Sequence, residues 1–372
     1  MSNRINERLK SFSKKQIDAV DFGVELYRQY QYEHENATGK YNKYACFAQT
    51  KAENGDILTY QAKNKVLHDM ILDEAYSISG LDKEKFSVKK AFAFQSFSMA
   101  YFSVIEEILN RTTAKTEIQE AFGFCEVQSL ADGDSLTFHI PSKHLLAIST
   151  VANGVRNSHL QKLHQQDITL APRAKKASVG LDLHKIYAGT VDYGYLINQL
   201  TKSFKTKFEK EIIDTMFGSF NTLSTPWVEN AYAQDAYIQL AERVGAANTS
   251  DCTVYGTKLA LSKVLPTNDY LKMGLGQEYV DQGYIAAPFG VPVVRLNQAV
   301  NPNSAYDFSI PNNYLLFLSS AEKVVKAALE GETQIRQTAQ FETADDVSAY
   351  TITQHWDIKI AAQANYGIMK TM

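Results

Sequence analysis

The sequence predicts an α+β fold, and three observations support this class. An apolar row at every fourth position indicates a long helix over residues 192–217. Strict alternation of apolar and polar residues indicates half-buried strands, such as 134–140 and 356–360. Helices and strands follow one another without regular βαβ repetition, which argues against a doubly wound parallel sheet. The 372 residues, 45% apolar and 21% charged, suffice for two or three compact units with a buried core.

The N-terminal third is predicted to be helical. Apolar residues at helical spacing predict an amphipathic helix around residues 17–27 and a second, short helix around 66–71. Residues 87–110 are dense in Phe, Met and Ile and are apolar on more than one face. A helix over this stretch must therefore be covered on several sides by other elements.

Half-buried strands are predicted before and after the long helix. In residues 134–140 the side chains at positions 136, 138 and 140 are apolar and share one face, and Pro141 ends the strand. In residues 356–360 Trp356 begins a similar alternation near the end of the chain. Both patterns are typical of strands with one buried and one exposed face.

The polar stretch over residues 152–180 is predicted to be a long excursion with a short strand near residues 168–170. Its five basic residues and one acid, Asp167, give a formal charge of +4 in a chain whose total is −3. A positive loop on a negative body is expected to find its counter-charges on a neighbouring copy, in a contact that repeats around a ring. We therefore expect a subunit interface at these five residues: Arg156, Lys162, Arg173, Lys175 and Lys176.

The clearest helix follows Asp192, which can cap it, and ends before Gly218, which stands in the position of a C′ glycine. Its apolar row recurs every four residues and so winds around the helix, which crosses several packing partners along its length. We expect the first members of the row to be buried as the main brace between strands. These are Leu196, Leu200, Phe204 and Phe208.

The second half of the chain is predicted to mix helices with buried strands. Thr225–Pro226 is expected to begin a helix that ends before Gly245. Gly290 and Pro292 are expected to form a bend, because Gly allows unusual backbone angles and Pro is confined to an edge or a strand start. Strands are expected at residues 253–255, 284–287, 290–294 and 314–318, and the segment 258–265 that follows the first of them is stopped by Pro266.

The sequence contains no motif of a known catalytic or cofactor site. Histidines at positions 139 and 144, and at 159 and 164, are five apart and do not share a helical face. The pair Gly274 and Gly276 lacks the third glycine of a dinucleotide fingerprint, and neither a Walker A loop nor a Gly-x-Ser-x-Gly elbow is present. We therefore predict no catalytic residue, no cofactor and no metal. A soluble α+β enzyme or binding protein with an unrecognised site is the alternative.

Composition excludes several other classes of protein. The odd and distant cysteines, Cys46, Cys125 and Cys252, predict reduced thiols and no disulfide framework. The N-terminus has no apolar signal region, and the most apolar stretch, 285–294, is far shorter than the ~20 residues of a membrane span. The net charge of −3 gives no electrostatic argument for nucleic-acid binding. We expect no membrane association.

Four segments, in this order, resemble the Hong Kong 97 type of phage major capsid protein. Residues 167–220 resemble the family's extended loop returning into its long spine helix. The segment CTVYGTKLALSKV resembles the strand that presents a short helix in the axial domain, and DQGYIAAPFGVPVV resembles that domain's Gly-x-Pro-Val strand. The closing strands of the peripheral domain are similar to IPNNYLLFLSS and DVSAYTITQHWDIKIAAQANYGI.

The resemblance implies a wedge-shaped subunit with an axial domain, a peripheral domain, an extended loop and an N-terminal arm. Its parts would be an N-terminal arm or added region (1–125), a strand and extended loop (126–190), a spine helix (191–225), an axial domain (226–330) and closing peripheral strands (331–372). The N-terminal region is longer than a simple arm requires. It would be an added domain, a scaffold-like segment or an enlarged arm.

The function implied by the resemblance is that of a major capsid protein. Such a protein assembles into hexamers and pentamers that form an icosahedral head shell around packaged double-stranded DNA, without sequence-specific contacts. Its partners would be further copies of itself, a portal, and scaffold or decoration proteins. It would be located in the virion after assembly in the host cytoplasm. The alternative within the same fold is a bacterial nanocompartment shell protein.

Overall fold

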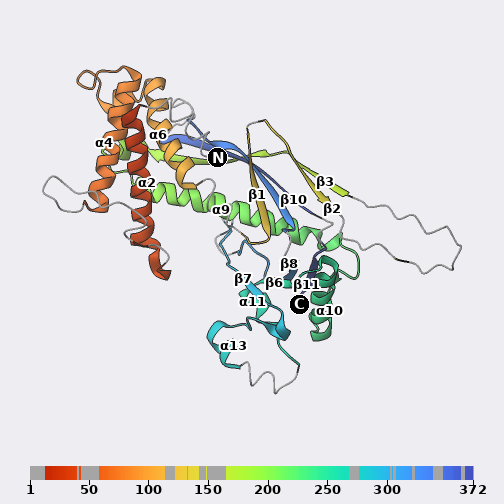
Figure 1. Cartoon of the computed structure of the whole chain (residues 1–372). Helices are drawn as coiled ribbons and strands as arrows, with labels where there is room; N and C mark the ends of the chain where they lie inside the picture. The colour runs from red at the N-terminus through yellow and green to blue at the C-terminus, as the bar shows by residue number, and fades with distance from the viewer. Residues whose placement is uncertain are drawn as a thin grey trace. The chain divides into compact units, whose positions relative to one another are not determined.

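The computed structural model divides the chain into two compact units (Figure 1). Unit 1 comprises Met1–Ile118, Ala174–Lys205 and Gly331–His355, and unit 2 comprises Gln119–Arg173, Thr206–Glu330 and Trp356–Met372. The described residues are 13–39, 42, 58–113, 122–131, 133–141, 148, 165–267, 276–301, 304, 307–320, 323–337, 347–361 and 365–371. Helices and strands are mixed in both units, which confirms the predicted α+β class.

Three long helices of unit 1 lie side by side: α2 (Lys14–Glu35), α4 (Tyr60–Ser79) and α6 (Gln95–Thr113) (Figure 1). Helix α2 begins with a capping box, in which the Ser13 hydroxyl accepts from Gln16 N and the Gln16 side chain accepts from Ser13 N. Helices α2 and α6 approach closely because Gly23 has no side chain, and a Cβ there would overlap the Ile108 side chain.

The stretch predicted as one apolar helix over 87–110 is two helices in the structure. A four-residue helix, α5 (Val88–Ala91), and a turn at 92–94 precede α6. Phe92, at the start of the turn, and Phe97, in α6, are both buried, with their ring centroids 5.1 Å apart at a steep angle. The turn therefore places aromatic rings from both sides in the core, which a continuous helix would direct to opposite faces.

A four-stranded sheet has the order β1-β9-β10-β4. Its strands are β1 (Cys125–Leu130), β9 (Val325–Gln337), β10 (Val347–Ile360) and β4 (Arg173–Asp182). Strand β1 pairs in parallel with β9, with Cys125 opposite Val325. The long strands β4, β9 and β10 each have residues in both units.

A two-stranded antiparallel hairpin is formed by β2 (Leu136–Pro141) and β3 (Gln165–Leu170). The predicted alternation is confirmed in β2, where Phe138 and Ile140 are buried and Thr137 and His139 are exposed. The predicted strand near 168–170 is confirmed as β3. The connection between the two strands lies outside the described residues except for position 148, and Arg156 and Lys162 fall in that part.

The prediction of a long polar excursion with strand content only around residues 168–170 is wrong for its last part. Arg173, Lys175 and Lys176 lie in the regular strand β4, followed by the short helix α8 (Leu183–Tyr187). The polar composition of this stretch concealed an alternation in which positions 175, 177 and 179 are partly buried and 176, 178 and 180 are exposed. A sheet strand accepts such residues when one face remains in water.

The predicted long helix is α9 (Tyr193–Gly218), and Asp192 caps it by accepting from Tyr195 N at 2.9 Å. Within the apolar row, Leu200, Phe204 and Phe208 are at most 5% exposed, whereas Leu196 is only partly buried. The prediction for Gly218 as a C′ glycine is wrong. Its φ of −59° is right-handed, because the chain continues into the 3-10 turn η2 (Ser219–Asn221) without a left-handed residue.

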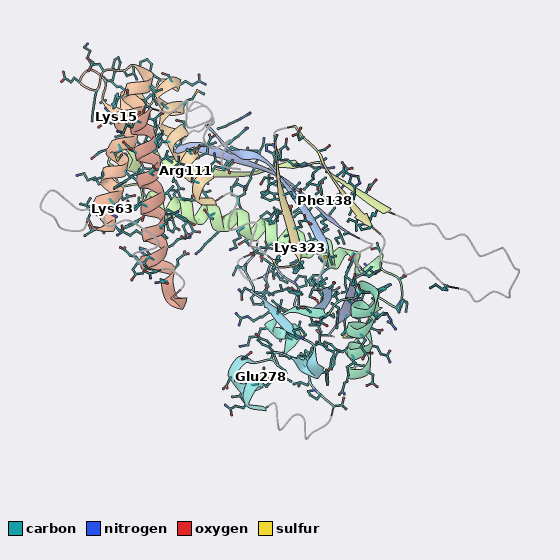
Figure 2. All side chains as sticks on the ribbon, in the orientation of Figure 1. Lys15, Lys63, Arg111, Phe138, Glu278 and Lys323 are labelled. Carbon is teal, nitrogen blue, oxygen red and sulfur yellow. The ribbon has the colours of Figure 1, made fainter. Side chains whose placement is uncertain are left out.

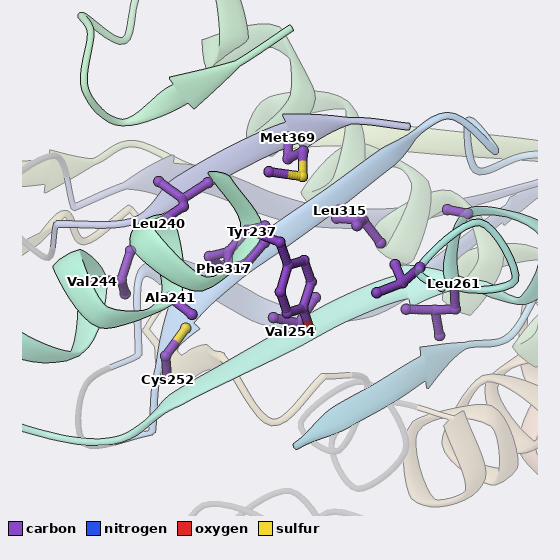
Figure 3. Close-up of a cluster of buried hydrophobic side chains, with 12 residues drawn as sticks. Tyr237, Leu240, Ala241, Val244, Cys252, Val254, Leu261, Leu315, Phe317 and Met369 are labelled. Atoms are coloured by element: carbon purple, nitrogen blue, oxygen red, sulfur yellow. The ribbon is translucent and has the colours of Figure 1, made fainter. Parts of the chain in front are cut away.

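Unit 2 contains a five-stranded sheet in the order β5-β11-β8-β6-β7. The strands are β5 (Val228–Glu229), β11 (Gly367–Lys370), β8 (Tyr314–Ser319), β6 (Cys252–Thr257) and β7 (Val293–Leu296). Helix α10 (Gln234–Asn248) packs on this sheet, and Figure 3 shows the buried cluster between them. Tyr237, Leu240 and Val244 on α10 meet Val254, Leu315, Phe317 and Met369 on the strands.

The predicted start of α10 at Pro226 is wrong. Residues 228–229 instead form β5, which pairs with β11, so the helix begins only at Gln234. Gly245 lies in the last turn of the helix rather than after its end. The left-handed C-cap residue is Thr249, with φ 51°. The pairing of β5 with β11, near the C-terminal end of the chain, therefore decided the structure here, although Pro226 favoured the start of a helix.

The segment 284–294 contains one strand rather than the two that were predicted. Residues 284–287 are not a strand, and a 3-10 turn η3 (Pro288–Gly290) precedes β7. Gly290 has φ +78°, which agrees with the predicted bend. Pro292 comes directly before β7, an edge strand, and its carbonyl accepts from Val254 N at 2.9 Å. Two further short helices, α11 (Lys258–Leu261) and α13 (Gly276–Gln282), belong to the same unit.

Candidate assembly surfaces

The base of the β2–β3 hairpin is fixed by polar contacts within unit 2. Ala171 N donates to Asp357 Oδ2 at 3.0 Å, and Lys359 Nζ donates to the Thr169 carbonyl at 2.7 Å. Gly133 N donates to the Glu330 carboxylate. Asp357 and Lys359 are the polar positions of the alternation in β10. The sheet therefore holds the end of the hairpin at which the chain enters and leaves it.

The two faces of the hairpin differ in chemistry. Figure 2 labels Phe138, which lies on the buried face of the hairpin. The Lys326 ammonium lies over the Phe138 ring, 5.4 Å from its centroid. Lys326 also binds Glu126 at 2.5 Å. Burial raises the pKa of Glu126, but hydrogen bonds from Lys326 and Gln128 outweigh burial and the net shift is downward. Glu126 is therefore held as a carboxylate beneath the hairpin.

The exposed face of the hairpin carries paired polar residues. His139 Nδ1 lies 2.7 Å from Asp167 Oδ1, and the hydroxyls of Thr137 and Thr169 are 3.0 Å apart. Both pairs link residues directly opposite each other in the two strands. An isolated two-stranded hairpin is only marginally stable in water, so contacts of this kind and the anchored base are what keep it in register.

The basic residues predicted to form one interface are not on one face of strand β4. Arg173 and Lys175 have the parity of one face and Lys176 that of the other, because successive side chains in a strand point to opposite sides. Lys175 is partly buried, whereas Arg173 and Lys176 are exposed. The sequence analysis grouped these residues by their charge alone. The two-residue alternation of a strand would have placed Lys176 on the opposite face from Arg173 and Lys175.

Unit 2 also has exposed apolar side chains that the sequence analysis did not identify. They include Leu259 (48% exposed), Val280 (78%), Val294 (42%), Val300 (58%) and Phe308 (59%). Val300 and Phe308 face each other across an isolated antiparallel bridge. The only available signal in the sequence was an apolar residue within the polar helix GQEYVDQ. Single exposed apolar side chains are common on protein surfaces, whereas neighbouring ones, as Val300 and Phe308 are, are more typical of surfaces that become covered on assembly.

A third feature is the set of polar contacts that holds the start of α9 within unit 1. Asn64 Nδ2 donates to the Val191 carbonyl at 2.5 Å, and Asn64 Oδ1 accepts from Tyr193 N at 3.1 Å. His68 Nδ1 lies 2.7 Å from the Tyr193 hydroxyl, which is also hydrogen-bonded to Tyr101. The N-terminal region predicted as an arm or addition therefore shares a compact unit with the start of α9.

Burial controls the ionisation of this network. His68 is 4% exposed, and burial lowers the pKa of its imidazole below the ordinary value of 6.5. Burial likewise raises the pKa of the Tyr193 hydroxyl. Both groups are therefore neutral at pH 7, and their hydrogen bonds are neutral as well.

An apolar hollow in unit 1 lies beside the same half of α9. It measures about 300 Å³, open solvent included, and Leu196 and Leu200 form one wall of it. Leu196, which is only partly buried, lines this hollow. The remaining lining side chains are also apolar: Phe102, Ile105, Leu109, Val179, Ile335 and Ile352.

Clusters of metal-ligating side chains and membrane-spanning helices are both absent from the described part of the chain. No group of three or more His, Cys, Asp and Glu side chains there is arranged to hold a metal ion. The described helices include none that is both long enough and apolar enough to cross a membrane. Cys125 and Cys252 are buried free thiols, and burial raises the pKa of each to about 12.

No protein-family model matches the chain, and comparison with curated proteins gives no match either. The chain is similar to the capsid of a native GTA particle (12% identity, 70% of this chain and 92% of that chain, TM-score 0.48). It is also similar to the mature capsid of bacteriophage PhiM1 (8%, 68% and 86%, 0.47) and to a virus-like particle from Pyrococcus furiosus (14%, 72% and 99%, 0.41). Because these TM-scores are all below 0.5, the proposal below rests on the chain's own residues.

Proposed function

We propose that the chain is the major capsid protein of a tailed bacteriophage, a shell-building protein without a catalytic residue. The observation that carries the proposal is the order of elements. A hairpin anchored at its base is followed by β4, the 26-residue helix α9, a unit with its own sheet, and the returning strands β9 and β10. This is the order that the four sequence segments predict.

The exposed chemistry supports the same proposal. Val280 is 78% exposed in the polar helix α13. Neighbouring copies would bury this side chain together with Val300 and Phe308. In the proposed subunit, residues 226–330 form the axial domain around a ring of copies, and the β2–β3 hairpin is the extended loop. Residues 191–225 are the spine, and 331–372 are the closing peripheral strands.

The proposed assembly consists of hexamers and pentamers that enclose double-stranded DNA without sequence-specific contacts. Besides further copies of the chain, the partners are a portal and scaffold or decoration proteins. Electron microscopy of the expressed chain should show closed shells of uniform diameter. Small oligomers alone would refute the proposal. Shells that enclose a protein cargo in their natural host, and no nucleic acid, would favour the nanocompartment alternative.

The basic part of β4 gives a test at the level of residues. Changing Arg173, Lys175 and Lys176 together to Glu should leave the subunit folded, as judged by circular dichroism, and should abolish shells in sedimentation. The effect must come from many repeated contacts, since one exposed ion pair contributes only ~0–1 kcal/mol. Wild-type particles from this variant would show that β4 is not an interface.

The exposed apolar surface gives an independent test. Val280→Asp changes a side chain that is 78% exposed, so the isolated subunit should fold normally and assembly should fail. The matched control is Val66→Asp on α4, where the side chain is 38% exposed and lies outside the proposed axial domain. The proposal expects shells from the control and none from Val280→Asp.

A further inference from the structure

Two side chains of strand β10 hold the backbone of the β2–β3 hairpin within unit 2. Asp357 Oδ2 accepts from Ala171 N at 3.0 Å, and Lys359 Nζ donates to the Thr169 carbonyl at 2.7 Å. Asp357 and Lys359 are two positions apart in their strand, as are Thr169 and Ala171 at the end of β3. Alternate residues of a strand share one face, so the two pairs meet in matching register. We call Asp357 and Lys359 the hairpin clamp.

The other end of the hairpin is fixed to a different strand. Gly133 N, just before β2, donates to the carboxylate of Glu330 on β9. Strands β9 and β10 are neighbours in the four-stranded sheet. One anchor point would leave the hairpin free to swivel, whereas anchors on two neighbouring strands fix its direction. Burial of its apolar face cannot do this alone, because the hydrophobic effect is non-directional.

The residue before the clamp ties the same strand to helix α9. Trp356 is buried, its Nε1 donates to Glu211 Oε2 at 2.7 Å, and its ring meets the ring of Phe208 edge to face. Trp356 and Asp357 follow each other in β10, so their side chains leave the strand on opposite faces. Adjacent residues of β10 therefore connect α9 on one face with the hairpin on the other, all within unit 2.

The clamp contacts are strong for their number and directional. Each has one charged partner, and hydrogen bonds of this kind are shorter and stronger than neutral ones. Asp357 Oδ1 also accepts from Ile358 N at 3.0 Å, which sets the orientation of the carboxylate. Both contacts reach backbone groups of the hairpin, so they do not depend on the side chains at positions 169 and 171.

We propose that the hairpin clamp fixes the angle between the β2–β3 hairpin and α9 and thereby selects the diameter of the shell. This inference rests on the proposed function, in which the hairpin of each copy contacts the next copy. The same angle then recurs at every contact, and an assembly closes only when the rotation from copy to copy closes. A hairpin with a variable angle would permit several rotations, and hence shells of several sizes.

The angle can be measured in the unassembled subunit with two spin labels. One is placed by Pro141→Cys at the exposed end of β2 and the other by Lys207→Cys on the unit 2 part of α9. The background is Cys46→Ser, and the two buried cysteines stay unlabelled. The intact clamp predicts one narrow distance distribution. The double variant Asp357→Ala/Lys359→Ala should broaden it, and an unchanged width would overturn the proposal.

Electron microscopy measures the consequence for assembly. In the double alanine variant, the share of protein found in shells of the wild-type diameter should fall by roughly tenfold, because the rotation between copies is no longer fixed. The matched control is Lys210→Ala/Asp214→Ala, which removes an ion pair of α9 and likewise leaves the net charge unchanged. It should keep the wild-type diameter. Shells of wild-type diameter from the double alanine variant would overturn the proposal.

A conservative variant separates the clamp from general damage to the fold. Asp357→Asn/Lys359→Arg keeps an acceptor and a donor, so it should restore the narrow distribution and the single diameter. If it behaves like the double alanine variant, these hydrogen bonds do not set the angle and the proposal fails. Should the double alanine variant not fold, Lys359→Ala alone carries the same expectation, because Lys359 is exposed.

The two measurements also separate this inference from the proposed function. If the wild type forms no shells, the proposed function and the selection of diameter fail together. The width of the label distribution still decides whether the clamp fixes the hairpin. If the wild type forms shells and the label distribution stays narrow without the clamp, the proposed function holds and only this inference fails.

Discussion

The two halves of helix α9 are held in different ways. The first half, residues 193–205, belongs to unit 1, where Asn64, His68 and Tyr101 fix its start through hydrogen bonds. The second half, residues 206–218, belongs to unit 2, where it is held mainly by aromatic packing. Phe208 meets the ring of Trp356 edge to face at 5.7 Å, and Phe217 stacks on Tyr314 at 4.7 Å.

The two halves of α9 therefore contribute to the stability of the fold in different ways. Buried aromatic side chains supply a large, non-directional free energy, whereas each hydrogen bond adds only ~0.5–1.5 kcal/mol net but requires a defined geometry. The second half of α9 is therefore secured chiefly by burial. The first half is set in register by directional bonds, and these bonds respond to pH.

The largest loss of stability is expected when a buried aromatic ring of α9 is removed. Phe208→Ala should lower the free energy of unfolding by about 3–5 kcal/mol, and Phe204→Ala, at the end of the first half, by a similar amount. The shift of the urea midpoint gives this value. Ser203→Ala on the exposed face is the control, with a change within about 0.5 kcal/mol. A Phe208→Ala protein as stable as the wild type would show that this ring is not part of the core.

An intermediate loss of stability is expected when the hydrogen bonds at the start of α9 are weakened. Tyr193→Phe keeps the ring but removes the hydroxyl that contacts His68 and Tyr101. The loss should be about 1–3 kcal/mol, since buried polar groups lose a partner without gaining water. Hydrogen exchange should show the change in residues 193–205 and not in 206–218. Equal loss of protection in both halves would mean that the two halves are not stabilised independently.

The smallest change in stability at pH 7 is expected from protonation of His68. This change becomes larger as the pH falls. Burial lowers the pKa of this imidazole in the folded protein. Below the ordinary pKa, the unfolded chain therefore binds a proton at His68 more readily than the folded chain does. Stability should be level above about pH 6.5 and should fall as the pH decreases below it, until the lowered folded pKa is reached.

The control for this pH dependence is His68→Gln, which retains a polar group but does not titrate. Its stability should fall less steeply than that of the wild type between pH 6.5 and 5, as measured by thermal melts at each pH. Parallel curves for the two proteins would assign the acid sensitivity to other groups.

Much of the fold was predictable where local periodicity is strong. The row through Leu200, Phe204 and Phe208 indicated α9, and the alternation around Phe138 indicated β2. Both signals arise from a single element with one buried face, so they are visible within a short window of sequence. The same holds for Pro292 and the edge strand β7, because Pro restricts hydrogen bonding at its own position.

The errors arose where a distant segment decided the structure. Strand β5 forms because β11, near the end of the chain, pairs with it, so the signal at Pro226 did not begin a helix. The hydrogen bonds that hold the start of α9 join Asn64 and His68 to Tyr193, more than 120 residues away in sequence. Local patterns contain no information about such pairs. The exposed residue Val280 was missed for the opposite reason, since one apolar residue in a polar helix is not a pattern.

The central claim, that the chain builds a closed shell, is tested most directly by the mass of the purified particle. Sedimentation velocity of the unmodified 41.7 kDa chain measures this mass without labels or variants. The account predicts a single species in the megadalton range that persists at physiological salt. A monomer or small oligomer as the sole species, under conditions in which circular dichroism shows a folded chain, would contradict it.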